Sequence, residues 1–344
     1  MDTERSFRLL LRTEVPPSWL AENGAMQTKR PPGSNWGDYG DTDRRGRLNE
    51  LTPKRVRRAA EEIRTGMRFC LSLPLDLPGG NVLHPSRYPP EHKFVERTNG
   101  ILAHDFPLSL QREGATGVVN DDMVVLYTQY STQWDAFSHI GSHFDANGDG
   151  EPEICYYNGT YPGPDVEEMA AACIVGRGVM VDLHRAYGTA KTYVDYDMLR
   201  EVMRDQNVTL KKGDILALHT GFGQVILNMH GHPDKETLHN SCAALDGSDP
   251  ELLEWITKSG VVAIVADNFA VEAYPARVRD PGTPFLPLHE HCLFKLGIHL
   301  GEIWYLTELA LWLEKHKRFR FFLAAPPLRL RGHVGSPANP IAVV

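Results

Sequence analysis

Two histidines that stand four residues apart, His139 and His143, are followed two residues later by Asp145. Neutral imidazole nitrogens and a carboxylate oxygen are good ligands for Zn²⁺, Mn²⁺ or Fe²⁺. On an α-helix the two imidazoles would share one face, but Asp145 would point roughly the opposite way, because each residue turns the chain by about 100°. We therefore expect an irregular loop that bends at Gly141. The spacing predicts that the three side chains hold one divalent ion.

The same stretch also matches the first half of a calcium loop. Asp145, Asn147, Asp149 and Gly150 follow the pattern Asp-x-Asn-x-Asp-Gly. Position 12 of such a loop requires a bidentate Glu, but Tyr156 stands there. Two alternatives to a transition-metal site therefore stay open. One is a calcium-stabilised binding protein without turnover, and the other is a loop without metal in which the histidines are only hydrogen-bonded.

Composition excludes several classes of protein. The chain has 344 residues, a net charge of −8 and 42% hydrophobic residues, which indicates a globular protein and argues against nucleic-acid binding. The five cysteines are scattered and form no Cys-x-x-Cys pair, which favours free thiols in a reducing compartment such as the cytoplasm. No apolar run reaches the roughly 18 residues of a membrane span. No Gly-x-Gly-x-x-Gly follows an expected strand, so a nucleotide cofactor has no support. The chain also has no Gly-x-Ser-x-Gly motif, which argues against a serine hydrolase.

The chain divides into a short N-terminal segment and one large domain. We interpret residues 1–35, rich in proline, glycine and charge, as an arm that wraps the body or a neighbouring subunit, or as a partly disordered tail. Residues 36–344 form the domain, in which Thr52 and Asp249, each followed by proline, predict helix starts. Residues 78–122 are either a lid or a set of short elements. Strands are expected at residues 123–128, 177–183, 214–219 and 260–266.

The putative cyclase family, which includes bacterial kynurenine formamidase and isatin hydrolase, carries the motif His-x-Gly-Thr-His-x-Asp-x-Pro-x-His. Residues 139–145 resemble the front half of this motif, with Ser142 in place of Thr. The back half departs from it, since Asn147 stands at the Pro position and Asp149 at that of the last His. Weaker matches run from about residue 34 to the end of the chain. The resemblance implies an α/β domain of the swivelling β/β/α type, with a central mixed, partly barrel-like β-sheet surrounded by helices.

The resemblance also implies roles for acids and histidines outside the motif. His289 and Glu302 fall where the family has a His and a Glu that complete the metal shell or handle protons, although a register shifted by two residues would select His291 instead of His289. Asp149 is a candidate substitute for the last motif His, which in the family is thought to help shuttle protons. Asp267 and Glu272 follow a buried strand, where they either brace the metal ligands or cap a turn.

Four further residues are candidates for substrate binding. Trp36, Trp134 and Phe222 would supply an apolar wall for a substrate that contains a ring. For Trp36, anchoring the N-terminal segment is an equal alternative. Thr220 lies in a segment that resembles a Gly-Asp-x-Leu-x-x-x-Thr-Gly pattern of the family and would offer its hydroxyl or backbone.

These observations predict a metal-dependent hydrolase with one divalent ion, Zn²⁺, Mn²⁺ or Fe²⁺. The ion would activate a water for attack on a C–N bond of an amide or lactam, or on the C–O bond of a lactone. A lyase or cyclase on the same scaffold is the alternative that uses the same metal. The expected partners are a small-molecule substrate and other copies of the chain, as a homodimer or homotetramer, with no nucleic acid and no membrane.

Overall fold

Nine strands form one sheet in the order β1-β17-β15-β9-β11-β13-β14-β6-β16. The computed structural model describes residues 29–344 except 98–99 and 280–281, so most of the predicted N-terminal arm lies outside the described residues. The sheet is mixed and curls into a half-barrel within a single α/β domain, as predicted. Its strands are β1 (Arg68–Cys70), β6 (Gln133–Asp135), β9 (Val175–Asp182), β11 (Ile215–His219), β13 (Ala263–Ala266), β14 (His299–Glu302), β15 (Arg320–Ala324), β16 (Gly335–Pro337) and β17 (Ile341–Val343).

The four central strands β9, β11, β13 and β14 are parallel, and antiparallel strands flank them on both sides. Alternate residues along these strands enter two separate hydrophobic clusters, one on each face of the sheet. Val179 and Val181 pack in one cluster, for example, while Met180 packs in the other. This explains the continuous apolar runs in the sequence, because both faces of the central strands are covered.

Helices bury apolar residues in both clusters. The first cluster includes Leu199 of α5 and Ile256 of α8, and the second includes Leu309 of α10. The helices are α2 (Pro53–Ala60), α3 (Val166–Ala171), α4 (Leu183–Tyr187), α5 (Tyr196–Asp205), α6 (Phe222–Asn228), α7 (Lys235–His239), α8 (Pro250–Ser259), α9 (Pro287–His289) and α10 (Thr307–Lys315). Shorter helical turns are η2 (Gly46–Glu50), η4 (Leu108–Leu110), η5 (Tyr157–Gly159) and the π-helical η6 (Glu290–Lys295). No helix in the described part is long and apolar enough to cross a membrane.

Both predicted helix starts are confirmed. The Thr52 hydroxyl accepts a hydrogen bond from the backbone N–H of Arg55, and proline follows it as the first residue of α2. Asp249 caps α8 in the same way through the backbone N–H of Glu251. These side chains satisfy backbone groups that have no partner inside the helix, so the sequence pattern alone suffices to locate the helix start.

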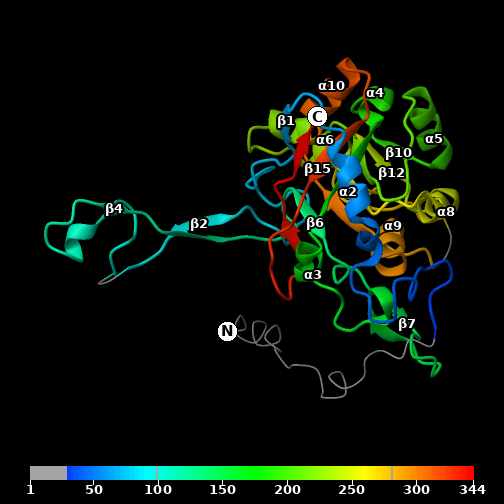
Figure 1. Cartoon of the computed structure of the whole chain (residues 1–344), viewed down its shortest axis with the longest axis horizontal. Coiled ribbons are helices and arrows are strands. Elements are labelled where there is room, and N and C mark those ends of the chain that lie inside the picture. Colours follow the sequence, from blue (N-terminus) through cyan, green and yellow to red (C-terminus); the bar gives the residue numbers. More distant parts are fainter. Residues whose placement is uncertain (1–28, 98–99, 280–281) are drawn as a thin grey trace.

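Four small pairs of strands lie outside the main sheet. Two of them, β2 (Glu91–Phe94) with β5 (Asp122–Val125) and β3 (Phe106–Pro107) with β4 (Val118–Val119), belong to a long extension that projects from the body (Figure 1). The strand expected at residues 123–128 is therefore part of this extension and not of the core. The other pairs are β7 (Ser142–Phe144) with β8 (Glu153–Cys155), and β10 (Thr192–Val194) with β12 (Ala243–Leu245).

Candidate metal centre

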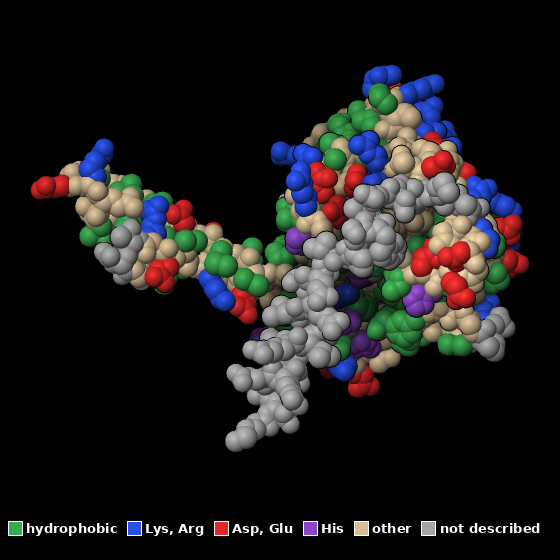
Figure 2. All heavy atoms as spheres, turned by 90° about the horizontal axis from the view of Figure 1, so that it is seen from below, with side chains coloured by type: hydrophobic (Ala, Val, Ile, Leu, Met, Phe, Trp, Pro, Cys, Tyr) green, Lys and Arg blue, Asp and Glu red, His purple; other side chains and the backbone are tan. Residues whose placement is uncertain are grey.

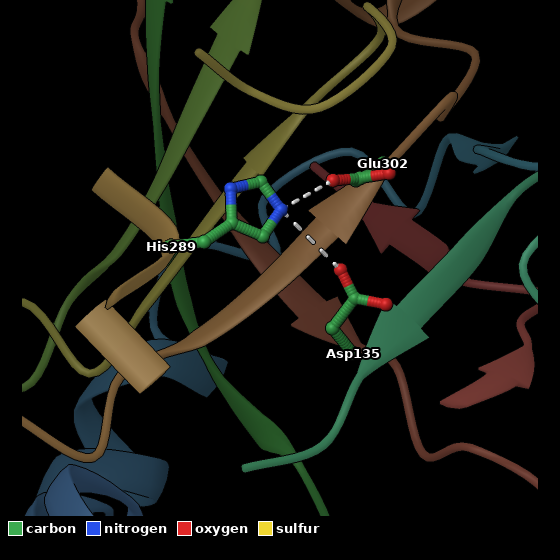
Figure 3. A group of neighbouring side chains, drawn as sticks. All are labelled: Asp135, His289 and Glu302. Atoms are coloured by element: carbon green, nitrogen blue, oxygen red, sulfur yellow. Dashed lines mark hydrogen bonds and ion pairs between the residues drawn. The ribbon is translucent and has the colours of Figure 1, made fainter. Parts of the chain in front are cut away.

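Asp135, His289 and Glu302 meet beside the neighbouring strands β6 and β14 of the sheet (Figure 3). Asp135 ends β6 and Glu302 ends the neighbouring strand β14, while His289 ends the short helix α9. One ligand atom from each side chain lies within 4.8 Å of those of the other two, and all three residues are buried. Within the described ranges this is the group of histidine, cysteine and acidic side chains whose geometry suits a metal ion.

The imidazole of His289 is held between two carboxylates. Its Nε2 lies 3.0 Å from Oε1 of Glu302, and its Nδ1 lies 2.8 Å from Oε1 of Glu272. Burial lowers the pKa of His289, but the hydrogen bonds to Glu272 and Glu302 outweigh burial and raise this pKa to about 10. Glu272 also accepts the backbone N–H groups of Leu288 and His289, at 3.1 and 2.9 Å. It therefore fixes the ring and the helix turn that carries it.

Asp135 has an oxygen without a hydrogen-bond partner in the protein. Its Oδ2 is buried and unpaired among the described residues, at 3.9 Å from Nε2 of His289. Burial and the nearby charge of Glu302 raise the pKa of Asp135 well above its usual value. A buried carboxylate in this state requires a cation or a proton. The unpaired oxygen and the mixed nitrogen and oxygen donors therefore fit a divalent metal ion.

Two polar residues flank the carboxylates of the centre. Gln133 donates from Nε2 to Oε2 of Glu302 at 2.9 Å, and more weakly to Oδ1 of Asp135 at 3.4 Å. The positive charge of Arg87 favours the ionised form of both carboxyl groups, although burial and the charge of Glu302 still leave the pKa of Asp135 raised. Arg87 is itself anchored by a 2.9 Å hydrogen bond to the carbonyl oxygen of Gln129.

His139 lies beside this group. Its Nε2 is 3.9 Å from Oδ1 of Asp135, and its side chain is 19% exposed, whereas that of Asp135 is fully buried. Burial and then the positive charge of His289 lower the pKa of His139 to about 4. At neutral pH the imidazole of His139 is therefore uncharged, with a nitrogen lone pair available at the more open side of the centre.

The structure does not bring His143, Asp145 and Asp149 to the centre. His143 lies in β7 and is exposed. Asp145 accepts the backbone N–H groups of Gly148 and Gly150 at 2.8 and 3.1 Å, and it also pairs with Lys29. Asp149 is exposed and accepts a backbone N–H in the next turn. The predicted set of His139, His143 and Asp145 thus contributes only His139 to this region.

Two of the predicted substrate residues lie in the core. Trp36 is 1% exposed and donates from Nε1 to the carbonyl oxygen of Phe294 at 2.7 Å. Trp134 is fully buried and donates to the carbonyl oxygen of Ala325 at 2.8 Å. Both indoles fill the interior and do not line a binding surface, as expected for large aromatic side chains whose N–H finds a buried partner. For Trp36 this agrees with the anchoring alternative.

The remaining predicted residues are not among the three side chains of the centre. The hydroxyl of Thr220 donates to Asp267 at 2.7 Å, and Asp267 also accepts the backbone N–H of Gly221, so this acid holds a turn and not a metal ligand. Glu272, by contrast, braces His289 as predicted. Phe222 lines a cavity of about 50 Å³ whose wall includes Glu272. A cavity of that volume admits a few water molecules.

A second register of the family motif would have revealed Asp135. When the segment Thr-His-x-Asp-x-Pro-x-His is placed on residues 132–139, Thr132, Asp135 and His139 match it, while Gln133 and Phe137 replace a His and the Pro. In this register the last motif His is His139 and is not missing. The register at residues 139–145 matches more of the motif residues, but only the register at residues 132–139 places the motif Asp in a buried strand, β6, that pairs with the strand of Glu302.

Comparison with known proteins assigns the family. A model of the putative cyclase family matches residues 71–273. The chain belongs to the putative cyclase family. A solved structure described as that of a novel cyclase is 31% identical to it, covers 92% of this chain and 100% of its own length, and superposes with a TM-score of 0.71. No curated protein matches the sequence.

Isatin hydrolases share the fold of this cyclase-family chain. Isatin hydrolase A from Labrenzia aggregata, bound to benzyl benzoate, is 13% identical with a TM-score of 0.54. The enzyme from Ralstonia solanacearum is 16% identical, also with a TM-score of 0.54, and each alignment covers 83% of this chain and 94% of the other. Membership of the family, together with the group at Asp135, supports an enzyme with a metal site.

Proposed function

We propose that this cyclase-family protein is a metal-dependent hydrolase that opens a C–N bond of a cyclic or aromatic amide, or the C–O bond of a lactone. The observation that carries the proposal is the unpaired Oδ2 of the buried Asp135 beside His289 and Glu302. These three residues would hold one divalent ion. A nitrogen ligand among them favours Zn²⁺, Mn²⁺ or Fe²⁺ over Ca²⁺, which prefers oxygen ligands alone.

When bound, such an ion supplies Lewis acidity that makes water nucleophilic near neutral pH and polarises a carbonyl group. The protein orients the ligands around it. With an ion bound, His289 would keep the proton on Nδ1 that it donates to Glu272 and would lose the proton on Nε2, whose lone pair would then be free to bind the ion. Gln133 holds the second oxygen of Glu302, so that both carboxylates stay fixed.

His139 is the group best placed to move a proton. It is neutral at pH 7 because its pKa is about 4, and it borders Asp135 on the more exposed side of the centre. A neutral imidazole there accepts a proton from the attacking water and returns it to the leaving nitrogen or oxygen. The positive charge of Arg87, which acts on Asp135, Glu302 and His139 alike, would stabilise negative charge that develops on the substrate oxygen.

The test combines metal analysis with a substrate panel. Purified protein is analysed by element-resolved mass spectrometry and then assayed with isatin, other aromatic lactams, N-formyl anilines and lactones in H₂¹⁸O. A transition metal bound one per chain, with ¹⁸O in the product, supports the proposal. Turnover without ¹⁸O would indicate the lyase or cyclase alternative, and a protein that binds only calcium without turnover would contradict an enzymatic role.

A further inference from the structure

A cavity in the body lies apart from the three side chains of the metal centre. Residues of the paired strands β10 and β12, of the helices α6 and α7 and of the segment that follows β13 form its wall. The extension that carries β2 to β5 projects away from the body and supplies none of the described lining (Figures 1 and 2). The cavity has a volume of about 50 Å³ and is partly open to solvent. It therefore admits the head of a small ligand, whose remainder would project outward.

Two buried polar atoms in the wall have no hydrogen-bond partner among the described residues. They are Oδ1 of Asn268, a residue that is 5% exposed, and Oγ of Ser241. The orientation of the Asn268 amide is fixed, because its Nδ2 donates to the carbonyl oxygens of Ala243 and Val271 at 3.1 and 3.2 Å. Oδ1 is therefore a buried acceptor, and the partner that it lacks is an N–H or O–H donor.

Aromatic rings form part of the remaining wall. Phe269 and Tyr274 both line the cavity, and their rings meet edge to face with centroids 5.4 Å apart. The faces of such rings attract cations. At the rim, the ammonium group of Lys191 donates to the carbonyl oxygen of His239 at 2.9 Å and lies 5.8 Å from the centre of the Tyr193 ring. An ammonium group of the chain itself thus makes the two kinds of contact that the cavity offers, and its exposed position lets solvent screen its charge.

Buried acids give the cavity a negative potential. Glu272 belongs to the wall and pairs with His289, and Asp267 directly precedes Asn268 in the chain and accepts hydrogen bonds from neutral groups. Both acids are fully buried. Burial and then the negative charge of Asp267 raise the pKa of the Cys242 thiol, another group of the wall, to about 12. A cationic ligand is therefore favoured in this cavity over an anionic one.

We propose that the cavity binds the ammonium head of a primary amine. The N–H donors of such a head match Oδ1 of Asn268 and the hydroxyl oxygen of Ser241, and its charge suits the aromatic faces and the buried acids. The carbon chain of the amine would lie along the aromatic rim toward solvent. This site is separate from the metal centre, and the proposal does not depend on the hydrolytic function proposed above.

Isothermal titration calorimetry of the full chain with n-butylammonium chloride tests the proposal. We expect one site per chain with a dissociation constant on the order of 1 mM, and at least about 10-fold weaker binding of n-butanol, which has the same length but no charge. Equal affinities for the two compounds, or the absence of saturable binding of n-butylammonium, would overturn the proposal. Ammonium chloride that binds as tightly as n-butylammonium would also overturn it, because the site would then be one for a free cation.

Repeating the titration after the metal has been removed with a chelator separates this site from the metal centre. Binding of n-butylammonium should persist, because Asp135, His289 and Glu302 are not in the cavity wall. An amine that binds only the metal-loaded protein would be at the metal centre, which contradicts the proposal.

Two variants place the amine in the cavity. Ser241→Ala removes a hydroxyl whose oxygen has no partner, so the affinity for n-butylammonium should fall about 3- to 10-fold. Ala244→Leu adds a larger side chain to the wall and should abolish binding. The matched control is Ser109→Ala in the exposed turn η4, which should bind as the unmutated chain does. Thermal unfolding checks that each variant is folded, and unchanged affinity in a folded Ser241→Ala variant would overturn the proposal.

Discussion

Two adjacent segments of the chain contain the same kinds of metal-ligand residue, but only one of them contributes to the candidate metal centre. Residues 133–139 carry Asp135 and His139, and residues 143–149 carry His143 and Asp145. The first segment begins with the fully buried strand β6, which pairs with β14 on one side and β16 on the other. The second lies in the exposed β7–β8 pair and its turn, where Asp145 accepts backbone N–H groups. Each segment thus offers one histidine and one aspartate, and the two segments differ in how deeply these side chains are buried.

The difference follows from solvation. The backbone N–H groups of Gly148 and Gly150 and the ammonium group of Lys29 satisfy the carboxylate of Asp145, so no metal ion is required there. Asp135 has lost water and has gained Glu302 as a neighbour of like charge, which makes an uncompensated anion costly there. A metal ion removes that cost. In this chain the electrostatic demand for a cation, rather than the spacing of ligands, locates the centre.

The largest expected effect comes from Asp135→Asn. The substitution removes the negative charge of a buried ligand. The affinity for the metal ion should therefore fall at least about 100-fold, and kcat/KM for hydrolysis should fall by on the order of 1,000-fold. His143→Ala, in the exposed segment, is the matched control and should retain metal and activity. Element-resolved mass spectrometry and kcat/KM check both. The reverse pattern would show that the second segment holds the ion.

A smaller effect is expected from Glu272→Gln, which weakens the hydrogen bond to Nδ1 of His289 without touching the ligand atoms. Metal affinity should fall about 10- to 100-fold, as measured by competition with a chelator. The pair of Asp182 and His219, also 2.8 Å apart, offers a control. Asp182→Asn should leave metal affinity unchanged, and an equal loss in both variants would indicate a general effect on the fold.

The smallest effect concerns acid stability of the metal-free protein. Burial lowers the pKa of His299, whose Nδ1 donates to the carbonyl oxygen of Asp135, to about 4. An unfolded histidine has a pKa near 6.5, so the unfolded chain binds the extra proton first and stability falls as pH drops from about 6.5 to about 4. This slope is at most about 1.4 kcal/mol per pH unit for one imidazole.

Urea unfolding at several pH values tests this linkage. His299→Gln should flatten the fall in unfolding free energy between pH 6.5 and 4 and leave its pH dependence above pH 7.5 as it was. If the unfolding free energy of the variant falls as steeply between pH 6.5 and 4 as that of the unmutated chain, His299 is not the buried neutral histidine that makes the protein sensitive to acid.

Local signals in the sequence predict local structure well. The caps at Thr52 and Asp249 and the buried strand β13 appear where expected. His289 and Glu302, which were named from an ordered match along the chain, lie together in the group of side chains that could hold a metal ion. These features depend on residues close together in the sequence or on a recognisable family pattern, and both can be read from one sequence.

The centre itself depends on contacts that span long distances in sequence. Asp135 meets Glu302 because β6 pairs with β14, a pairing that joins residues more than 160 positions apart. Periodicity does not encode that register, so the more recognisable histidine pair at residues 139 and 143 drew the prediction one segment too far. The burial of Trp36 and Trp134 escaped prediction for a related reason, since burial of an indole is a tertiary property.

Anomalous X-ray scattering at the absorption edge of the bound metal tests the central claim most directly. Crystals of the purified protein, without added metal, should give one strong anomalous peak per chain between Asp135, His289 and Glu302. A peak in the turn at Asp145 and His143, with none between Asp135, His289 and Glu302, would contradict the account.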